Sequence, residues 1–160
     1  MTKEIKRTEW PKFCKKFNSD NQFRRMKVNV ADKRHAGGQL VSESPFMGIV
    51  LEKKGRVIDG FQLFAGWASP EKVAQPVVSI KQPEKVVLEK DEKGRDSRLK
   101  VMTREGAEAT IQLVGEKNPT PFLEKLAYSI FEKRGYKHGA DMADWLEAEK
   151  KIREAEGKFI

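Results

Sequence analysis

The chain has 160 residues, which is typical of one domain or of one domain with a small appendage. Its hydrophobic share is 38%, enough for an ordinary core, and its longest apolar run, FMGIVL, is too short to cross a bilayer. The single cysteine excludes an internal disulfide and a zinc site built from several cysteines. With no apolar signal-peptide core at its start, the sequence predicts a cytoplasmic protein without membrane association.

The net charge of +8 is concentrated at the N-terminus. Residues 1–34 hold 11 basic and four acidic side chains, whereas residues 116–160 hold nine of each. An acidic partner would therefore be attracted mainly to the first part of the chain.

A short helix is expected near the N-terminus, with Thr8 as its N-cap and Pro11 in its first turn. Four apolar side chains then follow helical spacing, namely Trp10, Phe13, Cys14 and Phe17. The polar segment NSDN ends this helix.

Seven strand-like runs follow, from about residue 24 to residue 114. They are RRMKVNVA, PFMGIVLE, RVIDGFQLF, VVSI, KVVLEK, RLKVMTR and ATIQLV. The turns DEKGRDS and REGAE are typical of hairpins, so the last three strands should be antiparallel neighbours. Because no helix interrupts them, these runs predict an α+β fold with a small curled antiparallel sheet or barrel, covered by the first helix.

The segment GEKNPTP is the expected domain boundary, between a β-rich domain (1–115) and a helical hairpin (121–157). Thr120 is the expected N-cap of the first hairpin helix, with Pro121 at its first position. Its apolar stripe comprises Leu123, Leu126, Ala127, Ile130 and Phe131. Gly135 is the expected left-handed C-cap, and Tyr136 should fold back on the last turn.

The second hairpin helix should run from about Met142 to Glu156. Its expected apolar side comprises Met142, Trp145, Leu146 and Ile152. The connection KHGA is short, so the two helices should be antiparallel. A hairpin this small has little core of its own, and we expect it to dock on the β domain, on a second copy or on a partner.

Three places invite a chemical interpretation. His138, Asp141 and Asp144 would supply mixed nitrogen and oxygen metal ligands, but Asp141 stands at the expected N-cap of the second helix, which favours capping. Cys14 lies in an apolar stripe, which favours packing over nucleophilic chemistry. His35, in DKRHAGG, lies in a solvated turn or in an anion-binding loop. The sequence therefore predicts no catalytic residue, no metal site and no cofactor.

The N-terminal basic residues include four candidate nucleic-acid contacts, Lys15, Lys16, Arg24 and Arg25. The aromatic residues among them are expected in the core rather than as platforms for bases. Charge runs are most often solvated faces, so one contiguous positive face would favour nucleic acid, and interleaved charges would favour a solvated surface.

Two segments resemble bacterial families of unknown function. LAYSIFEKRG and HGADMADWLEAEKKI resemble domain-of-unknown-function family 2934 over about residues 121–154, with Trp145, Leu146, Ala148 and Glu149 on its DWLxAE signature. The opening EIKRTEWPKFCKKF and the strands behind it resemble family 5335 over about residues 3–114. These resemblances imply a bacterial origin and a two-part layout, and neither implies an activity.

The leading hypothesis is a non-catalytic module, in which a small β domain carries a helical hairpin that docks or recruits a protein partner. The alternative is a phosphate-directed nucleic-acid binder that uses the basic N-terminal face. A third hypothesis is an enzyme whose polar residues meet only in the folded chain. A continuous positive face would support the second hypothesis, and a polar cleft with converging titratable groups would support the third.

Overall fold

The computed structural model describes residues 1–32 and 38–160, with the backbone alone for residues 38–42. Residues 33–37, and His35 with them, lie outside the described residues, so the interpretation of that loop stays a prediction. The elements are β1 (Thr2–Ile5), η1 (Arg7–Glu9), α1 (Trp10–Asn21), β2 (Arg25–Ala31), β3 (Gly38–Lys54), β4 (Val57–Ser69), β5 (Lys72–Lys81), β6 (Pro83–Lys90), β7 (Asp96–Thr103), β8 (Glu108–Val114), α2 (Thr120–Lys133) and α3 (Asp141–Gly157).

The strands form one antiparallel sheet in the order β1-β6-β7-β8-β2-β3-β4-β5. Hairpins join β6 to β7 and β7 to β8, which confirms the predicted pairing of the last three strands. The edge strands β1 and β5 do not pair with each other in the described residues, so the α+β fold has an open sheet rather than a barrel. The sequence patterns do not predict β1, because its four residues bury only Ile5 and show no periodicity.

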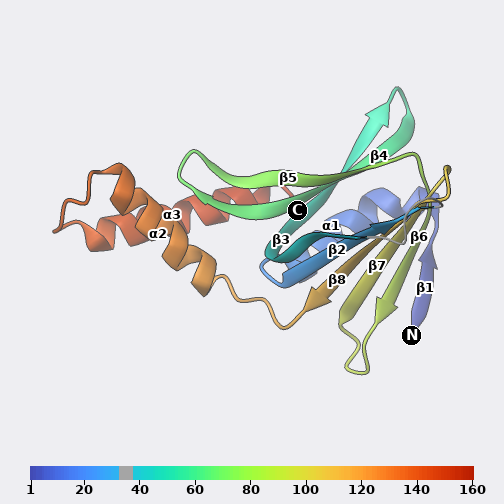
Figure 1. Cartoon of the computed structure of the whole chain (residues 1–160), viewed down its shortest axis with the longest axis horizontal. Helices are drawn as coiled ribbons and strands as arrows, with labels where there is room; N and C mark the ends of the chain where they lie inside the picture. Colours follow the sequence, from blue (N-terminus) through green and yellow to red (C-terminus); the bar gives the residue numbers. More distant parts are fainter. Residues whose placement is uncertain (33–37) are drawn as a thin grey trace.

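One hydrophobic core joins α1 to the sheet and contains residues of all eight strands. Figure 1 shows α1 lying against the sheet. Trp10, Cys14 and Phe17 of α1 are buried in it, as their helical spacing predicts. The ring of Phe17 meets that of Phe46 edge-on at 5.4 Å. The sheet therefore curls around a helix that the first segment of the chain supplies.

The start of α1 differs from the prediction. Thr8 lies inside the 3₁₀ helix η1, and the N-cap of α1 is Glu9, without a side-chain capping bond. The indole Nε1 of Trp10 donates to the carbonyl oxygen of Ile5 at 3.0 Å, which holds the chain close to β1. The 3₁₀ turn leads directly into the helix, so no side-chain cap precedes it.

The helices α2 and α3 form the predicted hairpin, which extends from one end of the molecule (Figure 1) and packs on residues of β3, β4 and β5. This second core contains Phe23, Met47, Phe122, Leu126, Ile130, Ala148, Ile152, Ala155 and Phe159. Gly135 ends α2 with a φ of 81°, and the N–H of Tyr136 donates to the carbonyl oxygen of Phe131, as predicted for a left-handed cap. Among the described residues, no helix has the length and apolar composition needed to cross a bilayer.

The N-caps of the two hairpin helices differ from the prediction by one residue. Pro119 rather than Thr120 is the N-cap of α2, and Ala140 rather than Asp141 is the N-cap of α3. Neither cap makes a side-chain hydrogen bond. Asp141 is instead an exposed residue of the first turn of α3, where its charge still complements the helix dipole.

The buried side of α3 also differs from the prediction. Ile152 is buried as expected, but Met142 and Leu146 are 70% and 55% exposed, and Trp145 is only half-buried. The helix instead buries Ala148, Ile152 and Ala155, together with Asp144. Small residues let α3 approach α2 and the sheet closely, and a pattern search for large apolar side chains overlooks them.

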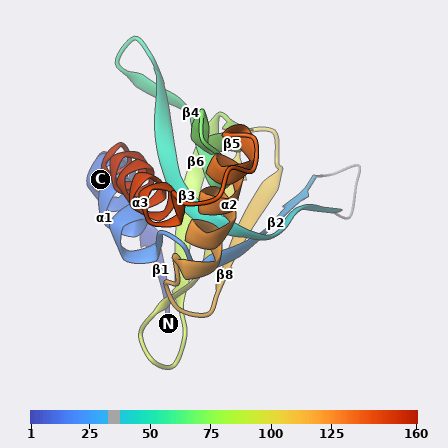
Figure 2. The same cartoon turned by 90° about the vertical axis from the view of Figure 1, so that its left-hand side faces the viewer.

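The end of α3 returns to α1, beside which the C-terminus lies (Figure 2). Asn18 of α1 donates through Nδ2 to the carbonyl oxygens of Ile49 and Phe159, at 3.0 and 2.9 Å. Gln22 donates to the carbonyl oxygen of Glu156 at 3.1 Å. Polar side chains of α1 therefore connect the first helix, the sheet and the last residues of the chain.

Candidate functional site

A groove of about 950 Å³ opens where the sheet meets the helical hairpin. One wall comes from β3 and β4, through residues 43–45 and 66–68, and the other comes from the linker 115–118 and the first turn of α2. The linker connects β8 to α2, and its backbone runs along one side of the groove. A groove at such a junction is a common position for binding sites.

The bottom of this groove is apolar. The rings of Phe23 and Phe122 lie 5.7 Å apart, and both side chains are buried. At Gly66, an added Cβ would lie 3.0 Å from Pro45 and 3.2 Å from the ring of Phe122, so the glycine keeps this region open. The indole of Trp67 also lines the groove and is 50% exposed. Exposed tryptophan beside buried phenylalanine gives a surface on which an apolar side chain can pack.

The charged lining of the groove has a positive excess. Arg25, Lys117 and Lys125 oppose Glu43 and Glu116. Arg25 lies 3.8 Å from Glu43, and Glu116 pairs at 3.6 Å with an arginine outside the groove. Lys125 has no ion-pair partner among the described residues. The two carboxylates are therefore partly neutralised, whereas the ammonium group of Lys125 is not.

A smaller cavity of about 390 Å³ shares residues 115–117 with the groove and opens beside α1. Its basic side chains come from five segments and are Lys16, Arg24, Lys90, Arg95 and Lys117. Three carboxylates also line it, those of Asp20, Asp96 and Glu116. We call it the basic pocket.

Arg24 is the buried member of the basic pocket, with an exposed fraction of 5%. Its Nε donates to the carbonyl oxygen of Gly115 at 2.6 Å, and its Nη1 donates to Asn21 Oδ1 at 2.9 Å and to the carbonyl oxygen of Asp96 at 2.6 Å. Burial lowers the pKa of this guanidinium, and the charge of Arg95 lowers it further, against the opposite effect of Asp96. The arginine is thus fixed in place by neutral oxygen atoms.

The four residues selected from the sequence are divided between two adjoining cavities and the open surface, and their contact with nucleic acid stays a prediction. Lys16 and Arg24 line the basic pocket, and Arg25 lines the groove. Lys15 is exposed on α1 and lines neither cavity. The sequence analysis missed Trp67, Arg95, Lys117 and Lys125, because only the fold brings these residues beside the N-terminal ones.

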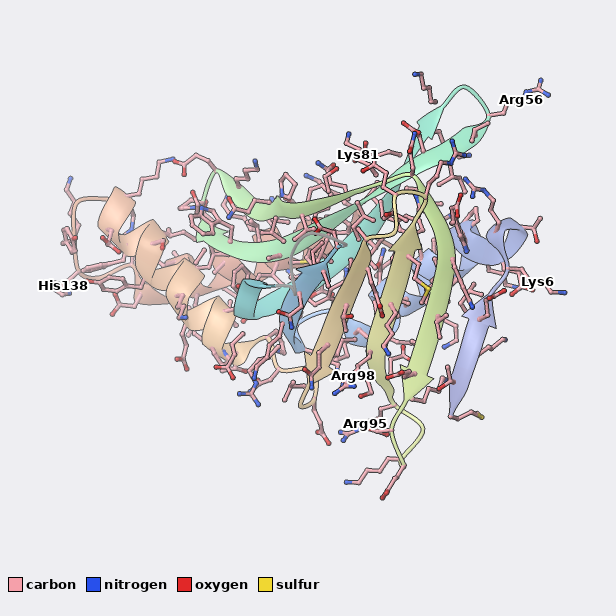
Figure 3. The ribbon with its side chains drawn as sticks, turned by 45° about the vertical axis from the view of Figure 1, so that its right-hand side comes forward. Lys6, Arg56, Lys81, Arg95, Arg98 and His138 are labelled. Atoms are coloured by element: carbon pink, nitrogen blue, oxygen red, sulfur yellow. The ribbon has the colours of Figure 1, made fainter. Side chains whose placement is uncertain are left out.

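Elsewhere on the surface, basic and acidic side chains are interleaved. On the outer face of the sheet, Lys85 lies 3.4 Å from Glu4, and Arg98 and Lys100 lie 4.0 and 3.2 Å from Glu89. The labelled side chains in Figure 3 are spread over the molecule, from Lys6 and Arg56 at one end to His138 at the tip of the hairpin. Such interleaving is typical of a solvated surface.

The other chemical candidates have structural surroundings. Burial raises the pKa of the Cys14 thiol to about 12, so the reactive thiolate is disfavoured at neutral pH. Asp144 accepts from Arg134 Nε at 2.8 Å and from Nη2 at 2.5 Å, and the ring of His138 packs against Phe131 at 5.3 Å. In the described part of the chain, no three residues among His, Cys, Asp and Glu are grouped to hold a metal ion.

Comparison with known proteins finds one family. Residues 123–154 match the family described as Protein of unknown function (DUF2934), which confirms the resemblance read from the hairpin. The second resemblance, to family 5335, is not supported. Neither the curated proteins nor the solved structures give a match. The matched segment corresponds to α2, α3 and their connection, so the likeness covers the hairpin.

Proposed function

We propose that this protein is a non-catalytic module that binds a segment of a partner polypeptide in the groove between the sheet and α2. The observation that carries the proposal is an exposed Trp67 above an apolar bottom, with Lys117 and Lys125 at the sides. Tryptophan at the centre of a pocket is a frequent source of binding energy in protein interfaces. The proposal includes a bacterial cytoplasmic setting, which rests on the family resemblance and the single cysteine.

The lining defines the chemistry of the partner segment. An apolar or aromatic side chain would pack on Phe23, Phe122 and Trp67. A neighbouring acidic residue would approach Lys125, whose ammonium group has no ion-pair partner among the described residues. We therefore expect a short segment with an acidic residue close to a large apolar one.

Selection from a random peptide display library on the immobilised protein tests this proposal. Enriched peptides should combine an acidic and a large apolar residue, and Trp67→Ala should weaken their binding by at least about tenfold, as expected for a central aromatic contact. Val57→Ala is the matched control, because Val57 is also an exposed apolar residue of β4 and lies outside the groove.

A second pair of variants tests the charge. Lys125→Glu should reduce binding of the enriched peptides, whereas Lys150→Glu should not, since Lys150 is an exposed lysine of α3 outside the groove. Equal binding by wild type, Trp67→Ala and Lys125→Glu would show that the peptides bind elsewhere and would overturn the proposal.

A further inference from the structure

The basic pocket concentrates positive charge from distant parts of the chain. Lys16 belongs to α1, Arg24 precedes β2, Lys90 ends β6, Arg95 lies in the β6–β7 turn and Lys117 lies in the linker. In Figure 3, Arg95 is visible at the end of the β6–β7 hairpin. The five cations exceed the three carboxylates that line the same cavity, which leaves the pocket with a positive excess.

The carboxylates of the basic pocket do not offset all of this charge. Asp20 pairs with Lys16 at 2.5 Å, Asp96 lies 3.7 Å from Lys90, and Glu116 lies 3.6 Å from Arg95. Arg95 also pairs with Asp91 at 3.2 Å. Each carboxylate of the pocket thus has its own cation.

Two cations of the pocket, Arg24 and Lys117, form no ion pair among the described residues, although the charge of Asp96 acts on Arg24. Arg24 is bonded only to carbonyl and amide oxygens, and Lys117 Nζ donates to the carbonyl oxygen of Ser19 at 2.8 Å. An anion in the pocket would therefore meet the exposed ammonium group of Lys117 and would lie close to the charge of the buried Arg24.

We infer that the basic pocket binds a phosphoryl group carried by the polypeptide segment that occupies the neighbouring groove. The inference rests on the proposed function for the source of the group, while the pocket is defined by its own residues. Charge-assisted bonds from arginine and lysine to phosphate oxygens are among the stronger hydrogen bonds in proteins. A phosphorylated side chain opposite such a cluster gains several of them at once.

The position of the basic pocket favours a side chain on a bound segment. Gly115, Glu116 and Lys117 line both the pocket and the groove, so a segment that crosses this linker can place one residue on each side. A single anionic group is favoured over a nucleic-acid backbone, which needs a continuous row of free cations. Among the described residues, the cations of the outer sheet face are instead paired with Glu4 and Glu89.

Inorganic phosphate is the first probe. Its addition should raise the melting temperature of the protein more than sodium chloride does at equal ionic strength. Lys117→Gln should weaken the apparent phosphate affinity by at least about fivefold, and the control Lys150→Gln should leave it unchanged. Lys90→Gln, which changes another lining cation outside the linker, provides a second variant in case Lys117→Gln disturbs the linker. Equal effects of phosphate and chloride, or unchanged affinity in both pocket variants, would overturn the inference.

Peptides distinguish the source of the phosphoryl group. Two synthetic libraries, with phosphoserine or serine at a fixed central position and random neighbours, should differ severalfold in retention on the wild-type protein, and Lys117→Gln should abolish the difference. Equal retention of both libraries would reject a phosphorylated segment even if free phosphate binds. If the phosphoserine preference persists in Trp67→Ala, the pocket stands and the proposed groove function fails.

A mixed-sequence, single-stranded DNA oligonucleotide is the final comparison. It should bind more weakly than the phosphoserine library. An oligonucleotide that binds more tightly than those peptides, and loses its affinity in Lys117→Gln, would replace the phosphorylated segment by nucleic acid and overturn the inference.

Discussion

Buried polar and titratable side chains in this protein serve to hold distant segments together. Asn21 donates through Nδ2 to the carbonyl oxygen of Phe17 and to the carboxylate of Asp96, and it accepts from Arg24. Asp144 is buried in α3 and paired with Arg134 at the end of α2. In both cases a residue whose burial is costly alone has its hydrogen bonds supplied by neighbours.

Cys14 should be unreactive in the folded protein. Because burial raises its thiol pKa to about 12, iodoacetamide at pH 8 should leave it unmodified, and unfolding in guanidinium chloride should make it reactive. Mass spectrometry after short labelling measures both states. Rapid alkylation of the native protein would mean that α1 opens readily or that the thiol is accessible.

The pair of Asp144 and Arg134 should make stability depend on pH. The hydrogen bonds from Arg134 lower the pKa of Asp144, so the pair stabilises the fold above the unfolded carboxyl pKa of about 3.9, and this contribution is lost as the pH falls through the lower folded value. Asp144→Asn should therefore lower the melting temperature at pH 7 and should differ less from wild type near pH 3.

Asp141→Asn is the control for this prediction, since Asp141 is exposed in the same helical turn. It should change the melting temperature much less than Asp144→Asn does at pH 7. Equal effects of the two changes would assign the stabilisation to the helix dipole rather than to the pair.

At the scale of elements, close approach depends on small residues. Ala148 and Ala155 let α3 approach its neighbours, and Gly48 of β3 lies under the ring of Phe159. That ring also lies 5.1 Å from the ring of Phe64. The docking of the hairpin thus depends on positions where a larger side chain would not fit.

Two substitutions of aliphatic side chains of equal size test which side of α3 is buried. Ile152→Ala should reduce the free energy of unfolding by about 2–5 kcal/mol, since it removes a buried aliphatic side chain. Leu146→Ala should change it by no more than about 0.5 kcal/mol, because Leu146 is exposed. Urea denaturation measures both changes. A larger loss of free energy of unfolding for Leu146→Ala than for Ile152→Ala would show that α3 buries the side predicted from the apolar pattern.

Gly48→Ala should be destabilising for a steric reason. The added Cβ would lie 2.6–2.8 Å from three atoms of Phe159, so the ring or the strand must shift, at a cost of about 1–3 kcal/mol. Gly157→Ala is the matched control, because nothing lies within 4 Å of its Cβ and alanine favours the helix. A stability of Gly48→Ala equal to that of wild type would mean that Phe159 is not packed on β3.

At the scale of the whole molecule, the hairpin is in direct contact with both α1 and the sheet. The end of α3 is bonded to α1 through Asn18 and Gln22, and α2 packs on β4. The boundary predicted at GEKNPTP coincides with the linker between β8 and α2, whereas its role as a boundary between independently stable parts stays a prediction.

Because these contacts cross the linker, we expect the chain to unfold as one unit. The slowest amides of α2 and of β7, at Leu126 and Val101, should exchange with similar free energies of opening. Hydrogen exchange followed by NMR measures both. A clearly lower value at Leu126 would show that the hairpin opens separately and that the predicted boundary divides two stable units.

The sequence by itself determined the fold class and most of the elements. Alternation in runs such as RLKVM marks strands, and the stripe of Trp10, Cys14 and Phe17 marks the buried side of α1, because these signals depend only on local periodicity. Gly135 likewise marks the end of α2, since the left-handed conformation favours glycine. The hairpin motif was specific enough to indicate its family.

Only the tertiary structure decided which face of α3 is buried and where the candidate site lies. Asp144 is buried because Arg134, ten positions earlier, supplies its counter-charge, and such a pairing has no local signal. The groove and the basic pocket combine residues from α1, the sheet and the linker, so no single segment contains their pattern. Charge composition indicated an excess of cations, and only their spatial arrangement shows which are neutralised and which converge on one cavity.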